Sequence, residues 1–126
     1  MAVLGLGLMA CQTPVEKEQS LKDAFDGKFL IGTALNTTQV AGEEPEAIEI
    51  TLKHFNSVVA ENCMKMESLQ PAEGAFFWDE ADAFIELAEA NNMHIVGHTL
   101  VWHSQAPDWL FLDEEGNEVA RDVLIE

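Results

Sequence analysis

Two short stretches of this sequence concentrate side chains that could do chemistry. The first is "AENCMK", residues 60–65, in which Glu61, Asn62 and Lys65 offer a carboxylate, an amide and an ammonium close together. The second is "GHTLVWHSQAPDW", residues 97–109, with two histidines, two tryptophans and a glutamine. A hydroxyl-rich ligand needs both hydrogen-bond donors and acceptors, and the first stretch supplies both. A sugar would use every side-chain type in the second.

The second stretch has the composition of a small-molecule pocket. Trp102 could offer its flat ring to the C–H groups of a pyranose. Hydrogen bonds to the sugar hydroxyls would come from His98, His103 and Gln105. An apolar platform with a few aimed polar groups is what such a pocket requires.

Both stretches also have purely structural interpretations. Glu61 and Lys65 could form a surface ion pair, which is common and stabilises little. Trp102 could pack under a loop, and His98 could be satisfied by backbone groups. Spacing alone leaves these alternatives open.

A metal site is a weaker alternative. Its candidate ligands would be Glu61, Cys63, His98 and His103, but no pair among them has CxxC or HxxxH spacing. We therefore expect no metal and no cofactor. The two other histidines, His54 and His94, flank predicted elements and have no candidate ligand beside them. We expect both to be structural.

The overall composition narrows the range of partners. The chain has 126 residues, with 23 acidic and 6 basic side chains and a formal charge of −17. Nucleic-acid binding requires phosphate neutralisation, and adhesion to anionic lipid requires basic groups, so both are excluded. A hydrophobic content of 48% is enough for a real core.

The candidate residues must be positioned by strands and helices that alternate along the chain. Apolar runs predict strands over 29–35, 57–60 and 94–102. The helical spacing of apolar residues predicts one helix over 45–55 and a second that has Asp79 as its N-cap and ends at 92. Residues 36–45 and 66–78 are predicted loops. Such alternation favours a parallel α/β sheet, in which both stretches follow the carboxyl ends of neighbouring strands. No GxGxxG or P-loop motif supports nucleotide binding.

The amino terminus predicts export. Residues 1–10 are uncharged and apolar, too short to span a bilayer but suited to a secretion signal. They end in "LMAC", which resembles a bacterial lipobox, so Cys11 is a candidate lipidation site and residues 11–22 a tether. The alternative is an apolar end with a buried cysteine. The expected location is the cell envelope or surface, reached across the inner membrane.

Two long segments carry a family resemblance. "FNSVVAENCMKMESLQPAEGAFFW" followed by "ADAFIELAEANNMHIVGHTLVWHSQAPDW" resembles the amino-terminal third of family 10 glycoside hydrolases, the endo-1,4-β-xylanases. The resemblance implies a (β/α)8 TIM barrel, of which residues 23–126 would form about the first three β/α units. It also implies that xylan or xylo-oligosaccharide is the partner. The implied substrate-binding residues are Glu61, Asn62, Lys65, His98, Trp102, His103 and Gln105.

The same resemblance implies that catalytic residues are missing. Family members retain anomeric configuration with two glutamates, one in a "WDVVNE"-like motif on the fourth strand and one in a "TELD"-like motif on the seventh. Neither motif occurs here. We therefore expect the 126-residue chain alone to be inactive. The alternatives are a non-catalytic lipoprotein that binds xylo-oligosaccharides weakly or not at all, and a split enzyme whose missing part is a partner.

Overall fold

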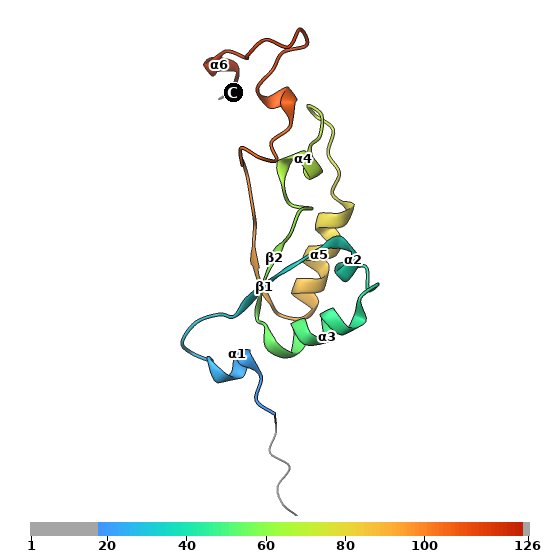
Figure 1. Ribbon diagram of the computed structural model, residues 1–126, viewed down its shortest axis with the longest axis vertical. Helices are drawn as coiled ribbons and strands as arrows, with labels where there is room; N and C mark the ends of the chain where they lie inside the picture. Colours follow the sequence, from blue (N-terminus) through green and yellow to red (C-terminus); the bar gives the residue numbers. More distant parts are fainter. Residues whose placement is uncertain (1–17, 125–126) are drawn as a thin grey trace, which may run out of the picture.

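The computed structural model describes residues 18–124 and contains one parallel sheet of three strands in the order β1-β2-β3. In Figure 1 the strands overlap near the middle of a long molecule, because the sheet is seen nearly edge-on. Parallel pairing and the intervening helices confirm the predicted alternation of strand and helix. The strands are β1 (Gly32–Leu35), β2 (Ser57–Ala60) and β3 (His94–Val96).

Two of the three predicted strands are too long. β1 begins at Gly32 rather than 29, because Gly32 pairs with Ser57, the first residue of β2, and the chain before it has no strand to pair with. β3 ends at Val96 rather than 102. Its last pair is Val96 with Val59, and β2 ends one residue later. Apolar composition predicted these extensions, but strand length is limited by the neighbouring strand.

Helix α3 (Pro45–His54) forms where its apolar spacing predicts. Pro45 stands at the start of the helix, where its missing N–H costs nothing. The predicted apolar face packs against the buried core through Ile48, Leu52 and Phe55.

Helix α5 (Asp79–Ala90) differs from the prediction at its first residue. The N-cap is Trp78, and Asp79 is the first helical residue. At this position the negative charge of Asp79 interacts favourably with the positive end of the helix dipole. Its buried face comprises Ala81, Phe84 and Ala88. Asn92 takes a positive φ of 53° just after the helix, as expected of a stop residue.

The core lies between the sheet and helices α3 and α5. Phe84 is fully buried and Val58 is 2% exposed, so they are its central side chains. Burying apolar side chains of this size contributes about 1.5–3 kcal/mol each. The other buried members are Leu35, Ala60, Cys63, Ala88 and Met93.

Two short helices lie in segments predicted to be loops. In α2 (Thr37–Val40), the Asn36 side chain accepts from the Gln39 N–H, and the Gln39 side chain accepts from the Asn36 N–H. This reciprocal cap is a recognisable N-terminal signature that the loop prediction missed. The second helix, α4 (Met66–Leu69), has Lys65 as its N-cap residue.

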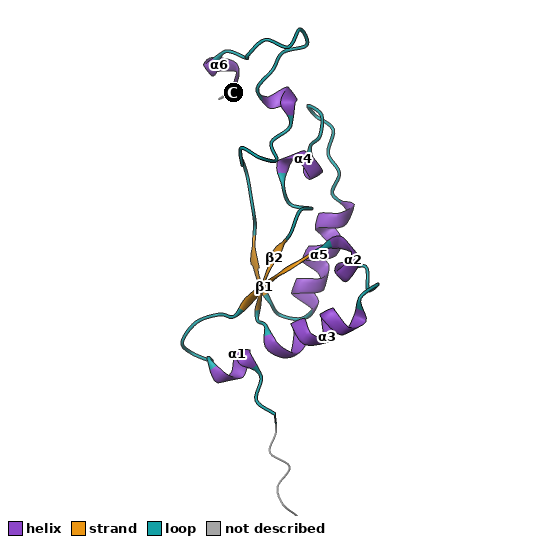
Figure 2. Ribbon diagram, viewed as in Figure 1, coloured by secondary structure: helices purple, strands orange, loops and turns teal. Residues whose placement is uncertain are grey.

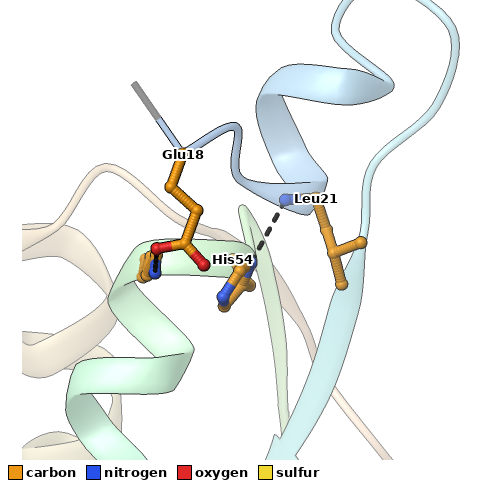
Figure 3. Close-up of polar contacts among 4 residues, drawn as sticks. Glu18, Leu21 and His54 are labelled. Atoms are coloured by element: carbon orange, nitrogen blue, oxygen red, sulfur yellow. Dashed lines mark hydrogen bonds and ion pairs between the residues drawn. The ribbon is translucent and has the colours of Figure 1, made fainter. Parts of the chain in front are cut away.

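The segment before β1 is fastened to the carboxyl end of α3. Helix α1 (Leu21–Ala24) is capped by the Ser20 hydroxyl. The Leu21 N–H donates to His54 Nδ1 at 3.2 Å, as Figure 3 shows. The Glu18 carboxylate pairs with Lys53 at 2.7 Å, which holds the pKa of Glu18 below its usual range. The predicted tether, 11–22, thus overlaps α1 in the described residues.

The carboxyl-terminal part runs away from the sheet. The 3₁₀ helix η1 (Asp108–Leu110) and the last helix, α6 (Arg121–Leu124), lie at the far end of the molecule in Figure 1. Between them, Asp113 accepts from the N–H groups of Glu115 and Asn117, which lowers the pKa of its carboxyl. Gly116 has a positive φ of 82° in the turn that these bonds close.

One face of the sheet carries no helix among residues 18–124. Helices α2, α3 and α5 lie together on the other side of the strands, as Figure 2 shows. Ala34, Val59 and Val96 are neighbours in register and alternate with the core-facing residues. Val96 is 45% exposed, so this face is open in the described chain.

Two observations concern the predicted anchor. Cys11, the candidate lipidation site, and the predicted signal segment lie outside the described residues. Within residues 18–124, no helix has both the length and the apolar character to cross a membrane.

Candidate functional site

The two chemistry-bearing stretches begin where β2 and β3 end. Glu61 follows the last residue of β2, and its N–H donates to the carbonyl of Leu35 at 2.9 Å, which continues the ladder by one bond. The chain then turns, with the Lys65 N–H donating to the Asn62 carbonyl at 2.9 Å. The second stretch leaves β3 as an irregular segment that contains a cis peptide bond between His98 and Thr99.

Lys65 is the centre of the cluster that results. Its side chain is buried, with the residue 8% exposed. The ammonium donates to Asn62 Oδ1 at 2.9 Å and to Gln105 Oε1. It also lies 4.9 Å from the ring centroid of Trp102, a cation–π distance. Its hydrogen-bond acceptors are neutral amides, so the positive charge is held by dipoles and by a π face.

The structural alternative, a surface ion pair between Glu61 and Lys65, is wrong. Glu61 is exposed, and within the described part of the chain its carboxylate makes neither a hydrogen bond nor an ion pair. It begins the same turn as Asn62 and Lys65 but stays outside their contacts. Of the seven predicted substrate-binding residues, it is the one that the structure does not bring into the cluster.

Two histidine rings flank Trp102. The His98 ring meets the indole edge-on, with centroids 6.0 Å apart and planes at 67°. The His103 ring does the same at 5.7 Å and 79°. Trp102 is 36% exposed, so the indole is not packed under a loop. Lys65, the two imidazoles and the indole thus form one mixed polar and aromatic cluster.

One backbone bond and one side-chain bond dock the second stretch on helix α4 and its C-cap residue, Gln70. The Glu67 N–H donates to the Gln105 carbonyl at 3.2 Å, and the Gln105 N–H donates to the Trp102 carbonyl at 3.1 Å. The Trp109 indole N–H donates to the Gln70 carbonyl at 2.9 Å. Trp109 was not among the predicted site residues, although it ends the stretch in which they occur.

The remaining candidates lie outside this cluster. Cys63 is buried in the core, and burial together with the nearby Glu80 carboxylate raises the pKa of its thiol. His54 accepts the hydrogen bond from Leu21, and His94 is an exposed residue of β3. Among residues 18–124, no three His, Cys, Asp or Glu side chains gather where they could hold a metal ion.

A hollow of about 290 Å³ adjoins the cluster on the open face of the sheet. Residues of all three strands line it, together with His98. His98 therefore belongs both to the mixed polar and aromatic cluster and to the lining of this hollow. The cluster thus lies at the carboxyl edge of an open parallel sheet, which is where barrel enzymes place their sites.

Sequence comparison identifies the family. The sequence profile of Glycosyl hydrolase family 10 matches residues 20–126. The chain belongs to this family. The family fold is a (β/α)8 barrel, and the three parallel strands with their helices are an amino-terminal part of it. The resemblance stated from the two long segments is confirmed.

Curated family 10 relatives are xylanases of greater length. The chain is 46% identical over 123 residues to an endo-1,4-beta-xylanase A of Xylanibacter ruminicola, covering 98% of this chain and 33% of the relative. It is 46% identical over 104 residues to an endo-1,4-beta-xylanase A of Halalkalibacterium halodurans, covering 82% and 26%. The chain thus spans about a third or less of these relatives.

Solved family 10 structures match the fold over the same share. TsXylA, an intracellular xylanase from Thermoanaerobacterium saccharolyticum, matches with a TM-score of 0.79 and 44% identity, over 87% of this chain and 34% of that one. A GH10 endoxylanase from a sugarcane soil metagenome matches with a TM-score of 0.78 and 39% identity, over 84% and 32%.

Proposed function

We propose that this chain forms the sugar-binding wall of an endo-1,4-β-xylanase, on the non-reducing side of the scissile bond. The observation that carries the proposal is the buried Lys65 ammonium, held by Asn62 and Gln105 beside the face of Trp102. Family membership and the curated relatives support xylan as the substrate. A solved relative is a complex with xylotriose, which supports a xylo-oligosaccharide as the ligand.

The cluster has the groups that a xylose ring requires. An ammonium has three N–H donors, and within the described residues two of them meet amide oxygens, which leaves one for a sugar hydroxyl. Trp102 supplies an apolar face for the C–H groups of the ring. His98 and His103 stand at its edges and supply further polar atoms.

Binding by these groups would assist catalysis performed elsewhere. Retaining glycosidases cleave through an oxocarbenium-like transition state with an acid/base and a nucleophilic carboxylate, and distortion of the sugar ring lowers the barrier. Contacts from Lys65, Asn62 and Trp102 that strengthen as the ring distorts would therefore raise the rate. Neither catalytic motif expected of the family occurs in these 126 residues.

We accordingly expect the 126-residue chain to release no reducing sugar from xylan. The measurement is a reducing-end assay with the purified chain, with a family 10 xylanase of full length as positive control. Sugar release above the blank that grows with chain concentration would contradict the expectation. The split-enzyme alternative predicts recovery of activity when a separate chain carrying the two motifs is added.

Titration with xylotriose tests the binding role directly. We expect heat of binding with the wild-type chain and its loss in Lys65→Met, which keeps the aliphatic stem but removes every N–H donor. His94→Phe, on β3 and outside the cluster, is the control and should bind as wild type. If the folded wild-type chain shows no binding, it lacks the sugar-binding role by itself.

We further propose that Cys11 is lipidated and anchors the chain at the cell envelope or surface. Support comes from the apolar run of residues 1–10 that ends at this cysteine. Metabolic labelling with an alkyne fatty acid should mark the wild-type chain and not Cys11→Ala. Labelling of both would contradict lipidation at Cys11. One relative is described as intracellular, so location requires its own measurement.

A further inference from the structure

Trp109 joins the two loops that build the candidate site. Its indole N–H donates to the carbonyl oxygen of Gln70 at 2.9 Å, across 39 residues of sequence. Gln70 is the C-cap of helix α4, and Lys65 is the N-cap of the same helix. One hydrogen bond therefore ties the segment carrying Trp102 and Gln105 to the element that begins at the buried ammonium.

The accepting carbonyl has a physical reason to need this donor. The last carbonyls of a helix have no partner within the helix, and α4 has a single turn. The Leu69 carbonyl accepts from the Phe77 N–H at 2.9 Å, and the Gln70 carbonyl accepts from Trp109. Both partners come from outside the helix, so the carboxyl end of α4 is fixed by the loops that flank it.

A second bond makes the connection a two-point attachment. The Glu67 N–H, near the start of α4, donates to the Gln105 carbonyl at 3.2 Å. Trp109, four residues after Gln105, binds the other end of the same helix through the Gln70 carbonyl. Pro107, between the two attachment points, is buried. The loop is thereby held along the length of α4, with the Gln105 side chain directed at Lys65.

We propose that Trp109 is a positioning residue for the sugar site. Its bond to Gln70 holds the loop of Trp102 and Gln105 in register with the turn of Asn62 and Lys65. Trp109 acts through these residues and need not touch the ligand. The inference rests on the proposed sugar-binding function, which the xylotriose titration tests separately.

Hydrogen exchange of single N–H groups tests the attachment in the 126-residue chain. In the wild type, the Trp109 indole N–H should exchange about tenfold more slowly than that of the half-exposed Trp78, because a hydrogen bond of this kind contributes roughly a factor of ten. Equal exchange of the two indoles would overturn the proposal without any variant.

Trp109→Phe then removes the donor while keeping an aromatic ring. The Glu67 amide should exchange about tenfold faster, and the amide of Val58 in the central strand should not change. Trp78→Phe is the matched control and should leave both amides as in the wild type. If Glu67 is unaffected, or if Val58 accelerates equally, Trp109 is merely structural and the positioning role is wrong.

Xylotriose affinity links the attachment to function. In Trp109→Phe we expect the affinity for xylotriose to fall about five- to tenfold. In the control, Trp78→Phe, both the xylotriose affinity and the urea midpoint should stay as in the wild type. Unchanged affinity with a faster Glu67 amide would overturn the positioning role. If the wild-type chain binds no xylotriose, the proposed function fails, and the Glu67 exchange still decides whether the attachment exists.

Discussion

Lys65 buries a full positive charge among neutral partners. A buried cation is costly unless hydrogen bonds replace its water, and the two amide oxygens of Asn62 and Gln105 supply them. The Trp102 face adds attraction without carrying a formal charge. A carboxylate in the same place would neutralise the ammonium, whereas amide oxygens leave its charge available to a ligand.

This arrangement predicts a specific coupling between Lys65 and Gln105. Gln105→Leu should reduce the free energy of unfolding by about 1–3 kcal/mol, because it removes an acceptor from a buried charged donor. In the Lys65→Met background the same change should cost much less, since no charge is then left unpaired. Urea unfolding of the four proteins measures both values. Additive costs would contradict the coupling.

At the element scale, α1 and the residues before it are held to α3 by a few polar contacts. Lys22 Nζ donates to the Leu52 carbonyl at 2.6 Å, beside the Leu21 to His54 bond and the Glu18 ion pair. Basic side chains near the carboxyl end of α3 also suit its dipole. The segment is therefore held by polar contacts at a helix terminus rather than by a shared core.

The ion pair predicts how this contact responds to pH. Lys53 lowers the pKa of Glu18 in the folded state. The pair therefore stabilises the folded state fully at pH values above the pKa of Glu18 in the unfolded chain. This stabilisation is lost as the pH falls through the pKa of Glu18 in the folded state. An NMR titration of the Glu18 carboxyl should give a midpoint below that of an ordinary glutamate. Lys53→Met should return the midpoint toward the ordinary value, and high salt should do so in part. A midpoint that Lys53→Met leaves unchanged would contradict the assignment.

At the scale of the whole molecule, the two faces of the sheet differ. One face packs on α3 and α5, and the other is open among residues 18–124. In a closed barrel of this family, an equivalent face would be an interior surface. The described chain therefore has a one-sided core, and its stability depends on one layer of helices.

Adjacent valines of β2 provide a measurement of this asymmetry. Val58→Ala should lower the free energy of unfolding by about 2 kcal/mol, because it leaves a cavity in the core beside Phe84. Val59→Ala, on the open face, should cost less than about 1 kcal/mol. Both values come from urea unfolding of the 126-residue chain. Equal costs would show that the open face is covered in solution, for example by a second copy of the chain.

The sequence by itself determined the order of the elements and the composition of the site. Helical spacing located α3 and α5 because their apolar residues recur on one face. The β-branched run 57–60 located β2, since it is buried against the helices over most of its length. Two motifs after successive parallel strands placed the candidate residues at one edge of the sheet and carried the family resemblance.

Only the tertiary structure decided where the strands stop and which site residues touch. Apolar composition could not reveal that β3 ends at Val96, because that limit is set by pairing with β2. Spacing could not separate Glu61, which stays exposed, from Lys65, which is buried against a loop 40 residues away. The role of Trp109 depends on a carbonyl at the end of α4. Each of these features is a long-range contact, which local sequence does not encode by itself.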